Sequence, residues 1–360
     1  MSIAPERYRA AASVDYEDVS LYSPSLGQGG MHLSLPTTTF CSRTFSNLED
    51  EKIWTRRWVA VGPAAQIPDA GDLLPRTVGN HGLHVERQQD GTLIARFNKA
   101  QHGGCRFIPR QCQTGSKTSC SYTSCGYSRD ESAISYKELS DPNRRLGQYV
   151  GHNPSKLLPA SVMEIAGQLF VHVEPGKSWT GHQKQQTITS LLSGWVVAPF
   201  TTHEAQWNAN WKLVMAAWIR DGAQLCLPES DDEAVSNKLA VYPNLCVETH
   251  KSGAFVHVLQ QVAMTATRVI TYCLGSEEAS LKLNDLRLSC EAEQARLDSL
   301  HAASMAHGRM ECFSYEHCNE EPYPEARALY RWLVEDLVCQ YPHESTEVIY
   351  LDPGFSARRN

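Results

Sequence analysis

Two short segments constrain the fold of this chain more than any other feature, because together they have the spacing of a metal site built from two loops. Residues 98–104 read NKAQHGG and residues 120–124 read CSYTS, and seventeen residues, 103–119, separate His102 from Cys120. Sites of this kind present a Cys-x-His pair on one loop and a Cys-x-x-His pair on a facing loop. Here the pairs read Ala-x-His and Cys-x-x-Thr, so His102 and Cys120 are the two ligands that remain of four.

The sequence on both sides of the first loop is typical of a small β domain. Residues from about 55 to 155 contain short strands separated by turn residues, such as Leu83–Arg87 and Leu93–Phe97, with Gly71 and Gly91 at turns.

The loops and their flanking segments resemble the α subunits of the Rieske non-haem iron oxygenases, which hydroxylate aromatic rings or remove N- and O-methyl groups. Phe45–Asp72 is similar to the family's leading segment: an amphipathic helix, a Trp-x-x-Val-Gly strand and an Ile-Pro-x-x-Gly-Asp turn. Gly91–Asn98 (GTLIARFN) is similar to the strand that leads into the first loop. The resemblance implies an α+β fold, with a small all-β Rieske-like domain followed by a helix-grip (START-like) domain in which an antiparallel sheet wraps a helix.

Three segments are expected along the chain. Residues 1–44 are rich in Ser, Gly, Pro and Tyr and are expected to form an extended N-terminal arm. Residues 45–160 are expected to form the Rieske-like β domain, and residues 161–360 the helix-grip domain. By the resemblance, residues 168–174 (QLFVHVE) are the strand through which the chain enters the second domain.

In the family the two loops hold a [2Fe–2S] cluster, and this chain has lost two of the four ligands. Ala100 stands at the first thiolate position and Thr123 at the second histidine position. Neither a methyl nor a hydroxyl group replaces a thiolate or an imidazole on iron, so each iron would keep only one protein ligand. We therefore expect no cofactor at His102 and Cys120.

A remodelled metal site is the alternative, since three further cysteines lie in the same stretch. Cys105, Cys112 and Cys125 would join His102 and Cys120 to hold zinc or an atypical iron–sulfur cluster. Their spacing is irregular, and free cysteines are the interpretation that we prefer.

The family's second metal site is a mononuclear iron held by two histidines and one carboxylate, and its nitrogen ligands are also missing. The strand-to-helix signature that precedes it is present in residues 208–214 (NANWKLV). The positions that carry a Glu-Asn pair, an acidic residue and the two histidines in the family are here Ala216, Ala217, Arg220, Ala223 and Pro228. A one-residue shift brings Asp221 to the acidic position and still supplies no histidine.

Asp336 resembles the family's carboxylate ligand near the C-terminus. No histidine occurs between His203 and His250, so the segment that should carry both histidine ligands has none. A lone carboxylate binds iron poorly, and we expect Asp336 to lie on a solvated helix face. An active site would need Asp336 together with a distant histidine such as His203 or His250.

At Arg220 the chain has also lost the acidic residue that the family carries at this position. In the family the acidic residue at this position bridges a cluster histidine of one subunit to an iron ligand of its neighbour, and a guanidinium accepts no hydrogen bond. No catalytic residue is therefore assigned.

Hydrophobic periodicity predicts a sheet and then a helix in the last third of the chain. Ala254–Leu274 alternates as a strand pair does, and His257 within it is expected to be a packed histidine. Its candidate core positions are Val256, Val258, Met264, Val269, Ile270 and Tyr272. Ser276–Arg309 is charged, rich in Ala and Leu, and predicts one or two helices.

The composition excludes several classes of protein. The 360 residues are 42% apolar with a net charge of −7, which argues against nucleic acid as a partner. No apolar stretch is long enough to span a membrane, and Met1–Arg9 lacks the apolar core of a signal peptide, so we expect a cytoplasmic protein without membrane association. Twelve cysteines without regular spacing indicate reduced thiols.

Losses at the cluster, the bridge and the iron predict a protein that keeps the family's fold without its chemistry. We expect a non-catalytic structural or regulatory subunit that partners an active Rieske oxygenase paralogue, because the family assembles as trimers and hexamers in which one subunit's cluster faces its neighbour's iron. Two alternatives stay open. One is an active Rieske-type oxygenase, a hydroxylase or demethylase, with remodelled metal sites; the other is a binding protein for a small apolar ligand.

Overall fold

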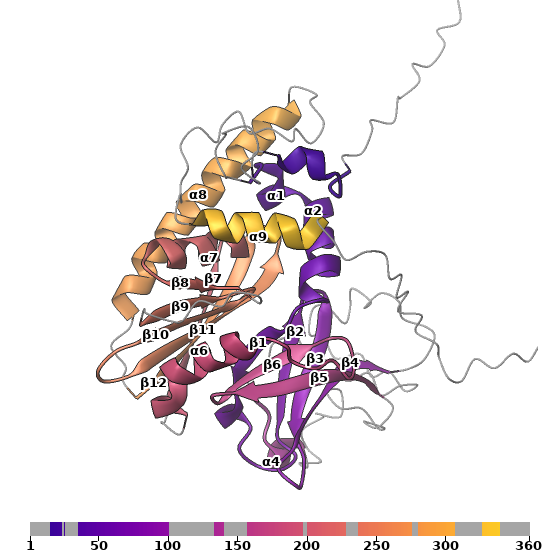
Figure 1. Ribbon diagram of the computed structural model, residues 1–360, viewed down its shortest axis with the longest axis vertical. Helices are drawn as coiled ribbons and strands as arrows, with labels where there is room; N and C mark the ends of the chain where they lie inside the picture. Colours follow the sequence, from indigo (N-terminus) through magenta and orange to yellow (C-terminus); the bar gives the residue numbers. More distant parts are fainter. Residues whose placement is uncertain are drawn as a thin grey trace, which may run out of the picture.

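Two six-stranded sheets and the helices that cover the second of them make up the described part of the chain (Figure 1). The computed structural model describes residues 15–23, 25, 35–100, 133–139, 157–196, 200–227, 237–275, 280–306 and 326–338.

The first sheet has the strand order β1-β6-β5-β4-β3-β2, and each neighbouring pair is antiparallel. Its strands are β1 (Val59–Pro63), β2 (Leu73–Val78), β3 (His81–Arg87), β4 (Leu93–Ala100), β5 (Leu157–Ile165) and β6 (Gln168–His172). The predicted strands Leu83–Arg87 and Leu93–Phe97 lie within β3 and β4. Gly91 turns the chain between them with a φ of 82°, a conformation that glycine adopts without strain.

The expected domain boundary after residue 160 falls inside β5. The strand expected to enter the second domain is β6, which lies in the first sheet instead. The reason is local: Ala166 and Gly167 have φ angles of 48° and 77° and close a β5–β6 hairpin, and β6 also pairs with β1. The first sheet therefore extends to His172, and the division of the chain into domains remains a prediction.

The described residues of segment 1–44 are folded, which corrects the expectation of an extended arm. They contain a 3-10 helix (Val19–Tyr22), α1 (Thr38–Cys41) and the start of α2 (Arg43–Glu49). Tyr16, Tyr22 and Phe40 are at most 4% exposed, and Tyr16 packs edge-on against Phe45 with ring centroids 5.6 Å apart. Burial of these rings removes a large apolar area from water and so holds the segment against the core.

The second sheet has the order β7-β12-β11-β10-β9-β8, with only the β8–β9 pair parallel. Its strands are β7 (Phe200–Trp207), β8 (Gln224–Cys226), β9 (Lys238–Val241), β10 (Leu245–Thr249), β11 (Ala254–Ala263) and β12 (Ala266–Leu274). The strand pair predicted over Ala254–Leu274 is confirmed as β11 and β12.

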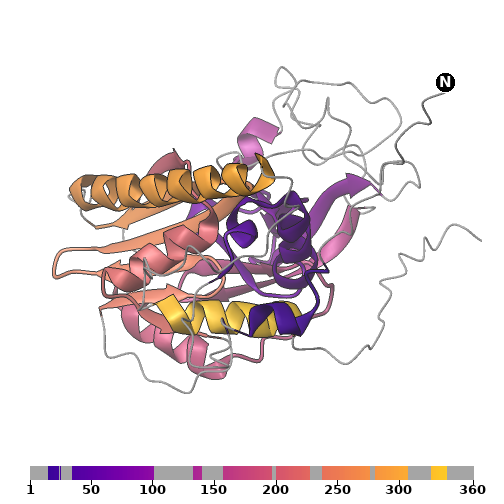
Figure 2. The same ribbon diagram turned by 90° about the horizontal axis from the view of Figure 1, so that it is seen from above.

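Helices lie on both sides of this sheet (Figures 1 and 2). The longer ones are α6 (His182–Leu192), α7 (Trp211–Arg220), α8 (Ser280–Ala306) and α9 (Arg327–Val338). Shorter elements are a π-helix (Asp50–Trp54), α4 (Tyr136–Leu139) and 3-10 turns at Ala64–Gln66 and Ser193–Trp195. The helix predicted in Ser276–Arg309 is confirmed as α8. Among the described helices, none is long and apolar enough to cross a membrane.

Both faces of the second sheet are buried. Val256, Val258, Ile270 and Tyr272 pack in one cluster with Ile188 and Leu192 of α6. Val269 packs on the other face, in the cluster that contains α7, and Met264 is a half-buried residue of the β11–β12 turn. Five of the six candidate core positions are buried, and they lie on two different faces of the sheet. Alternation alone does not show which face a residue is on when helices cover both faces.

Asn244 joins the two sheets. Its Oδ1 accepts a hydrogen bond from the Ala60 amide of β1 at 2.9 Å, and its Nδ2 donates to the carbonyls of Ala60 at 2.9 Å and Leu259 at 3.1 Å. The residue is 2% exposed. One side chain therefore satisfies backbone groups of β1 and β11 that would otherwise be buried without partners.

Asn244→Ala is expected to lower the free energy of unfolding by about 2 to 3 kcal/mol, because it leaves these backbone groups unsatisfied in the core. Urea denaturation followed by tryptophan fluorescence measures the change. Asn237→Ala is the matched control, since Asn237 donates to the Thr249 carbonyl at 3.0 Å at an exposed site. Equal effects of the two substitutions would contradict the role of Asn244.

Candidate functional site around α7 and α9

α7 begins where the Asn-Trp-Lys signature predicts a helix. Asn210 has an extended backbone conformation, and its side-chain oxygen accepts a hydrogen bond from the Lys212 amide at 3.0 Å, which is a helix N-cap. Every residue from Trp211 to Ile219 is buried, so α7 runs through the core. Ala216 and Ala217 are 0% exposed and contribute only methyl groups at two of the expected site positions.

The described residues at the end of α7 also form no metal-ligating group. The Arg220 guanidinium donates to Ser289 Oγ of α8 at 3.1 Å, and the Asp221 carboxylate accepts from Lys238 Nζ of β9 at 2.5 Å. Ala223 is buried, and Pro228 lies outside the described residues. The described positions thus hold methyl groups, a guanidinium and an ion-paired carboxylate.

The side chain of Asp336 on α9 is buried, which corrects the expectation of a solvated face. It is 0% exposed. Arg57 Nε donates to both carboxylate oxygens at 3.0 Å, and Arg57 Nη2 also contacts Oδ1. Tyr242 Oη donates to Oδ2 at 2.9 Å. An arginine and a tyrosine from distant segments therefore hold this carboxylate.

Two further contacts surround this group. The Arg57 guanidinium lies 5.8 Å from the ring of Trp332, also on α9. Lys184 of α6 donates to the Tyr242 carbonyl at 2.6 Å, and burial lowers the pKa of Lys184 to about 8. Burial and then the nearby Asp336 carboxylate raise the pKa of Tyr242, so its phenol remains a protonated donor.

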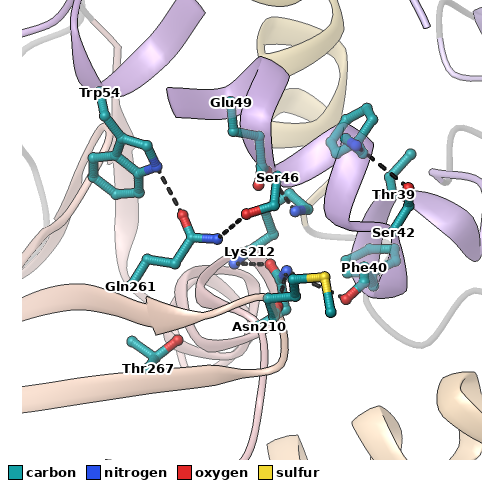
Figure 3. Close-up of polar contacts among 12 residues, drawn as sticks. Thr39, Phe40, Ser42, Ser46, Glu49, Trp54, Asn210, Lys212, Gln261 and Thr267 are labelled. Atoms are coloured by element: carbon teal, nitrogen blue, oxygen red, sulfur yellow. Dashed lines mark hydrogen bonds and ion pairs between the residues drawn. The ribbon is translucent and has the colours of Figure 1, made fainter. Parts of the chain in front are cut away.

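A second buried ion pair joins α2 to α7 (Figure 3). Lys212 Nζ lies 2.5 Å from Glu49 Oε1, and both side chains are 0% exposed. The rings of Phe40, Phe45 and Trp211 lie 5.2, 5.3 and 5.5 Å from this ammonium. Burial raises the pKa of Glu49 and lowers the pKa of Lys212, while the charge of each partner opposes the shift of the other.

Polar side chains beside this pair bond to one another (Figure 3). Gln261 of β11 accepts from Trp54 Nε1 at 2.9 Å and donates to Ser46 Oγ at 3.0 Å. Asn210 Nδ2 donates to the Met264 carbonyl at 2.6 Å. These contacts tie the N-terminal helices to α7 and to the β11–β12 hairpin, so the group serves the fold.

The candidate histidines His203 and His250 do not join Asp336 in a metal-ligating group. His203 is exposed on β7, and His250 Nε2 lies 2.8 Å from Glu248 Oε1. His257 is 2% exposed, with Nδ1 2.9 Å from Thr271 Oγ1, and is packed as expected. Within the described residues, no group of three or more His, Cys, Asp or Glu side chains is arranged to hold a metal ion.

The candidate cluster ligands His102, Cys105, Cys120 and Cys125 lie outside the described residues, as does Cys112, so the expectations for them stay predictions. The described cysteines are free thiols: Cys41, Cys226, Cys246, Cys273 and Cys290.

Sequence reasoning missed Arg57, Tyr242 and Glu49. Neither Arg57 nor Tyr242 carries a local signal, because their contacts with Asp336 span 279 and 94 residues. Lys212 did carry one: it is the only charged residue in the run WKLVMAAWI, and a charge inside an apolar helix requires a buried partner. The sequence did not identify that partner.

The fold has a counterpart among solved structures. The solved apo form of the quaternary ammonium Rieske monooxygenase CntA matches with a TM-score of 0.53 and 14% sequence identity, over 91% of this chain and 99% of the other. This likeness shows an α+β fold shared with the α subunits of Rieske non-haem iron oxygenases.

The chain matches no family model, and sequence comparison finds partial relatives among the same oxygenases. The biphenyl 2,3-dioxygenase α subunit of Rhodococcus jostii (strain RHA1) is 29% identical over 99 residues, which are 27% of this chain and 22% of the relative. The carnitine monooxygenase oxygenase subunit of Escherichia coli (strain K12) is 18% identical over 193 residues, 52% of this chain and 50% of the relative. The matched parts span half or less of these curated relatives. Its relatives in sequence and structure are Rieske oxygenase α subunits, as the resemblance implied.

The described residues do not fit the mononuclear iron of that class. Such an iron takes two imidazoles and a carboxylate with open coordination positions. Here Asp336 is held by Arg57 and Tyr242, and Ala216 and Ala217 present methyl groups. No reaction step is therefore assigned to an iron at this position.

Proposed function

We propose that this chain is a non-catalytic, cytoplasmic subunit that partners an active Rieske oxygenase α subunit in a mixed trimer or hexamer, as a structural or regulatory member. The observation that supports this most is the state of Asp336. The carboxylate that resembles an iron ligand already has a largely buried arginine as its counter-charge.

The fold supports the same proposal, because the described residues form a packed core. Each sheet has six strands, and Asn244 links them through β1 and β11. We expect a chain that keeps this core to assemble with proteins of the same fold even though its candidate metal ligands are replaced. Fold by itself does not assign chemistry, so the proposal rests on the site residues.

The cavity between the two sheets does not favour the apolar-ligand alternative. It has a volume of about 10 Å³ and is lined in part by Trp54, Arg76, Asn244 and Gln260. A space of this size holds about one water molecule, and its lining is partly polar.

Metal analysis is the first test. The chain is expressed with iron and sulfide supplied anaerobically, and iron, zinc, acid-labile sulfide and visible absorption are measured beside an active α subunit treated identically. A colourless protein without stoichiometric iron or sulfide is expected. About two irons and two sulfides per chain would contradict the proposal and support an oxygenase with a rebuilt cluster.

Co-expression is the second test. The tagged chain is produced together with an untagged active α subunit from the same organism, and the mass and subunit ratio of the purified complex are determined. A mixed assembly of both chains is expected. Recovery of this chain only as separate homo-oligomers or monomers would contradict the partner role.

A further inference from the structure

Asp336 resembles the carboxylate that binds iron in Rieske oxygenases, but its partner in this structure is the guanidinium of Arg57. We propose that Arg57 is the permanent counter-charge of Asp336 and excludes a metal ion from it, so that the group acts as a latch. This latch fixes α9 to the segment before β1 and to the β9–β10 turn. This inference rests on the proposed function, because both assume that Asp336 binds no iron.

Donor groups of Arg57 and Tyr242 contact both oxygens of the carboxylate. Oδ1 receives Arg57 Nε and Nη2, and Oδ2 receives Arg57 Nε and Tyr242 Oη. Arg57 Nε has a single hydrogen shared between the two oxygens, so three donor groups, Nε, Nη2 and the Tyr242 hydroxyl, hold the carboxylate. A metal ion would therefore have to displace donors that are already in place.

Burial and local charge make that displacement costly. Asp336 and Arg57 have side-chain exposures of 0% and 15%, and Tyr242 is 0% exposed. A guanidinium pushed away from its carboxylate would lose its counter-charge in a largely buried position. Lys184, bonded to the Tyr242 carbonyl, adds a second cationic group beside the site. Two basic side chains oppose the approach of a divalent cation.

The latch connects three parts of the chain at one point. Arg57 follows the π-helix and precedes β1, Tyr242 lies between β9 and β10, and Asp336 lies on α9 beside Leu337, which is buried in the core. Trp332 of α9 lies near the same guanidinium, so α9 contacts Arg57 through two side chains one helical turn apart. Loss of the ion pair should therefore loosen all three segments together.

Hydrogen exchange measured by mass spectrometry on the isolated, metal-free full chain tests the latch. Arg57→Met and Asp336→Asn are each expected to speed amide exchange in α9 by at least about tenfold, with faster exchange also around β1 and Tyr242. The double variant Arg57→Met/Asp336→Leu, which removes both charges, is expected to recover most of the protection. Arg331→Met is the matched control on α9, because Arg331 pairs with Glu335 at 2.9 Å on the exposed side. Single variants that exchange like this control would overturn the latch.

A second experiment, with added iron, tests the latch and the proposed function independently of each other. Ferrous iron is added anaerobically to the wild-type chain and to Asp336→Asn, and exchange is measured again. No change in α9 is expected in either protein. Iron that slows exchange of wild-type α9 but not of Asp336→Asn would overturn both proposals. Stoichiometric iron that binds both proteins equally would overturn the proposed function alone, since Asp336 would not be its ligand.

Discussion

Lys212→Met is expected to lower the free energy of unfolding by about 3 to 5 kcal/mol. Methionine keeps the approximate length of the side chain but removes the ammonium that lies 2.5 Å from Glu49 Oε1. Glu49 is 0% exposed, and burial already raises its pKa, so it would remain as an uncompensated charge or bind a proton. Urea denaturation with tryptophan fluorescence at pH 7 measures the loss.

Two companion variants separate the ion pair from general damage to the core. Lys212→Met/Glu49→Met is expected to recover most of the lost stability, because replacing both partners of a buried pair is often close to neutral. Lys52→Met removes a lysine from the adjacent π-helix, where Lys52 is 31% exposed and pairs with Glu17 at 3.5 Å. This control should change stability by less than about 0.5 kcal/mol. A Lys212→Met protein as stable as the control would show that the pair is unimportant.

Acid is expected to destabilise the protein through His257. Burial, followed by the charge of Lys238, lowers the pKa of His257 to about 3, while its ordinary value is 6.5. Between these values the unfolded chain binds a proton at this histidine and the folded chain does not. The free energy of unfolding therefore falls as the pH drops from about 6.5 towards 3, by up to about 5 kcal/mol from this group.

The contribution of His257 is isolated by substitution. His257→Gln keeps a group able to bond Thr271, whose hydroxyl lies 2.9 Å from His257 Nδ1, but it binds no proton. Stability measured by urea denaturation at pH 7, 6, 5 and 4 should fall less steeply in His257→Gln than in the wild type. His203→Gln is the matched control, because His203 is exposed and lies directly across the β7–β12 pair from Thr271. Identical slopes for His257→Gln and the wild type would contradict the prediction.

Both predictions concern buried polar groups, which the sequence indicated only in part. His257 lies inside an alternating apolar run, so its packed state was predictable from its neighbours on the strand. Its low pKa was not, because the surrounding Trp218 ring at 4.7 Å comes from α7. The sequence showed Lys212 as a charge in an apolar helix, yet Glu49 lies 163 residues away. A single sequence does not identify such a pair.

At the candidate site, too, the sequence predicted some features and only the structure showed the others. Replacement of the ligands on and after α7 was readable from residue types, since Ala216 and Ala217 cannot bind iron in any conformation. The fate of Asp336 was not readable, and the expectation of a solvated face was wrong. A helical Glu-Asp pair looks alike whether it faces water or an arginine from another segment. Which face of α9 is buried depends on what packs against it.

The sequence by itself determined the local elements and the class of fold. Alternation predicted the β11–β12 pair, the apolar spacing of Ser276–Arg309 predicted α8, and the strand-to-helix signature of residues 208–214 indicated the start of α7. Short-range hydrogen bonding and side-chain periodicity decide these features, and both are visible within about ten residues. Only the tertiary structure decided that β6 joins the first sheet, that residues of the N-terminal segment pack on the core, and that Arg57 holds Asp336. These outcomes depend on burial and charge pairing between segments far apart in the chain, which no local pattern records.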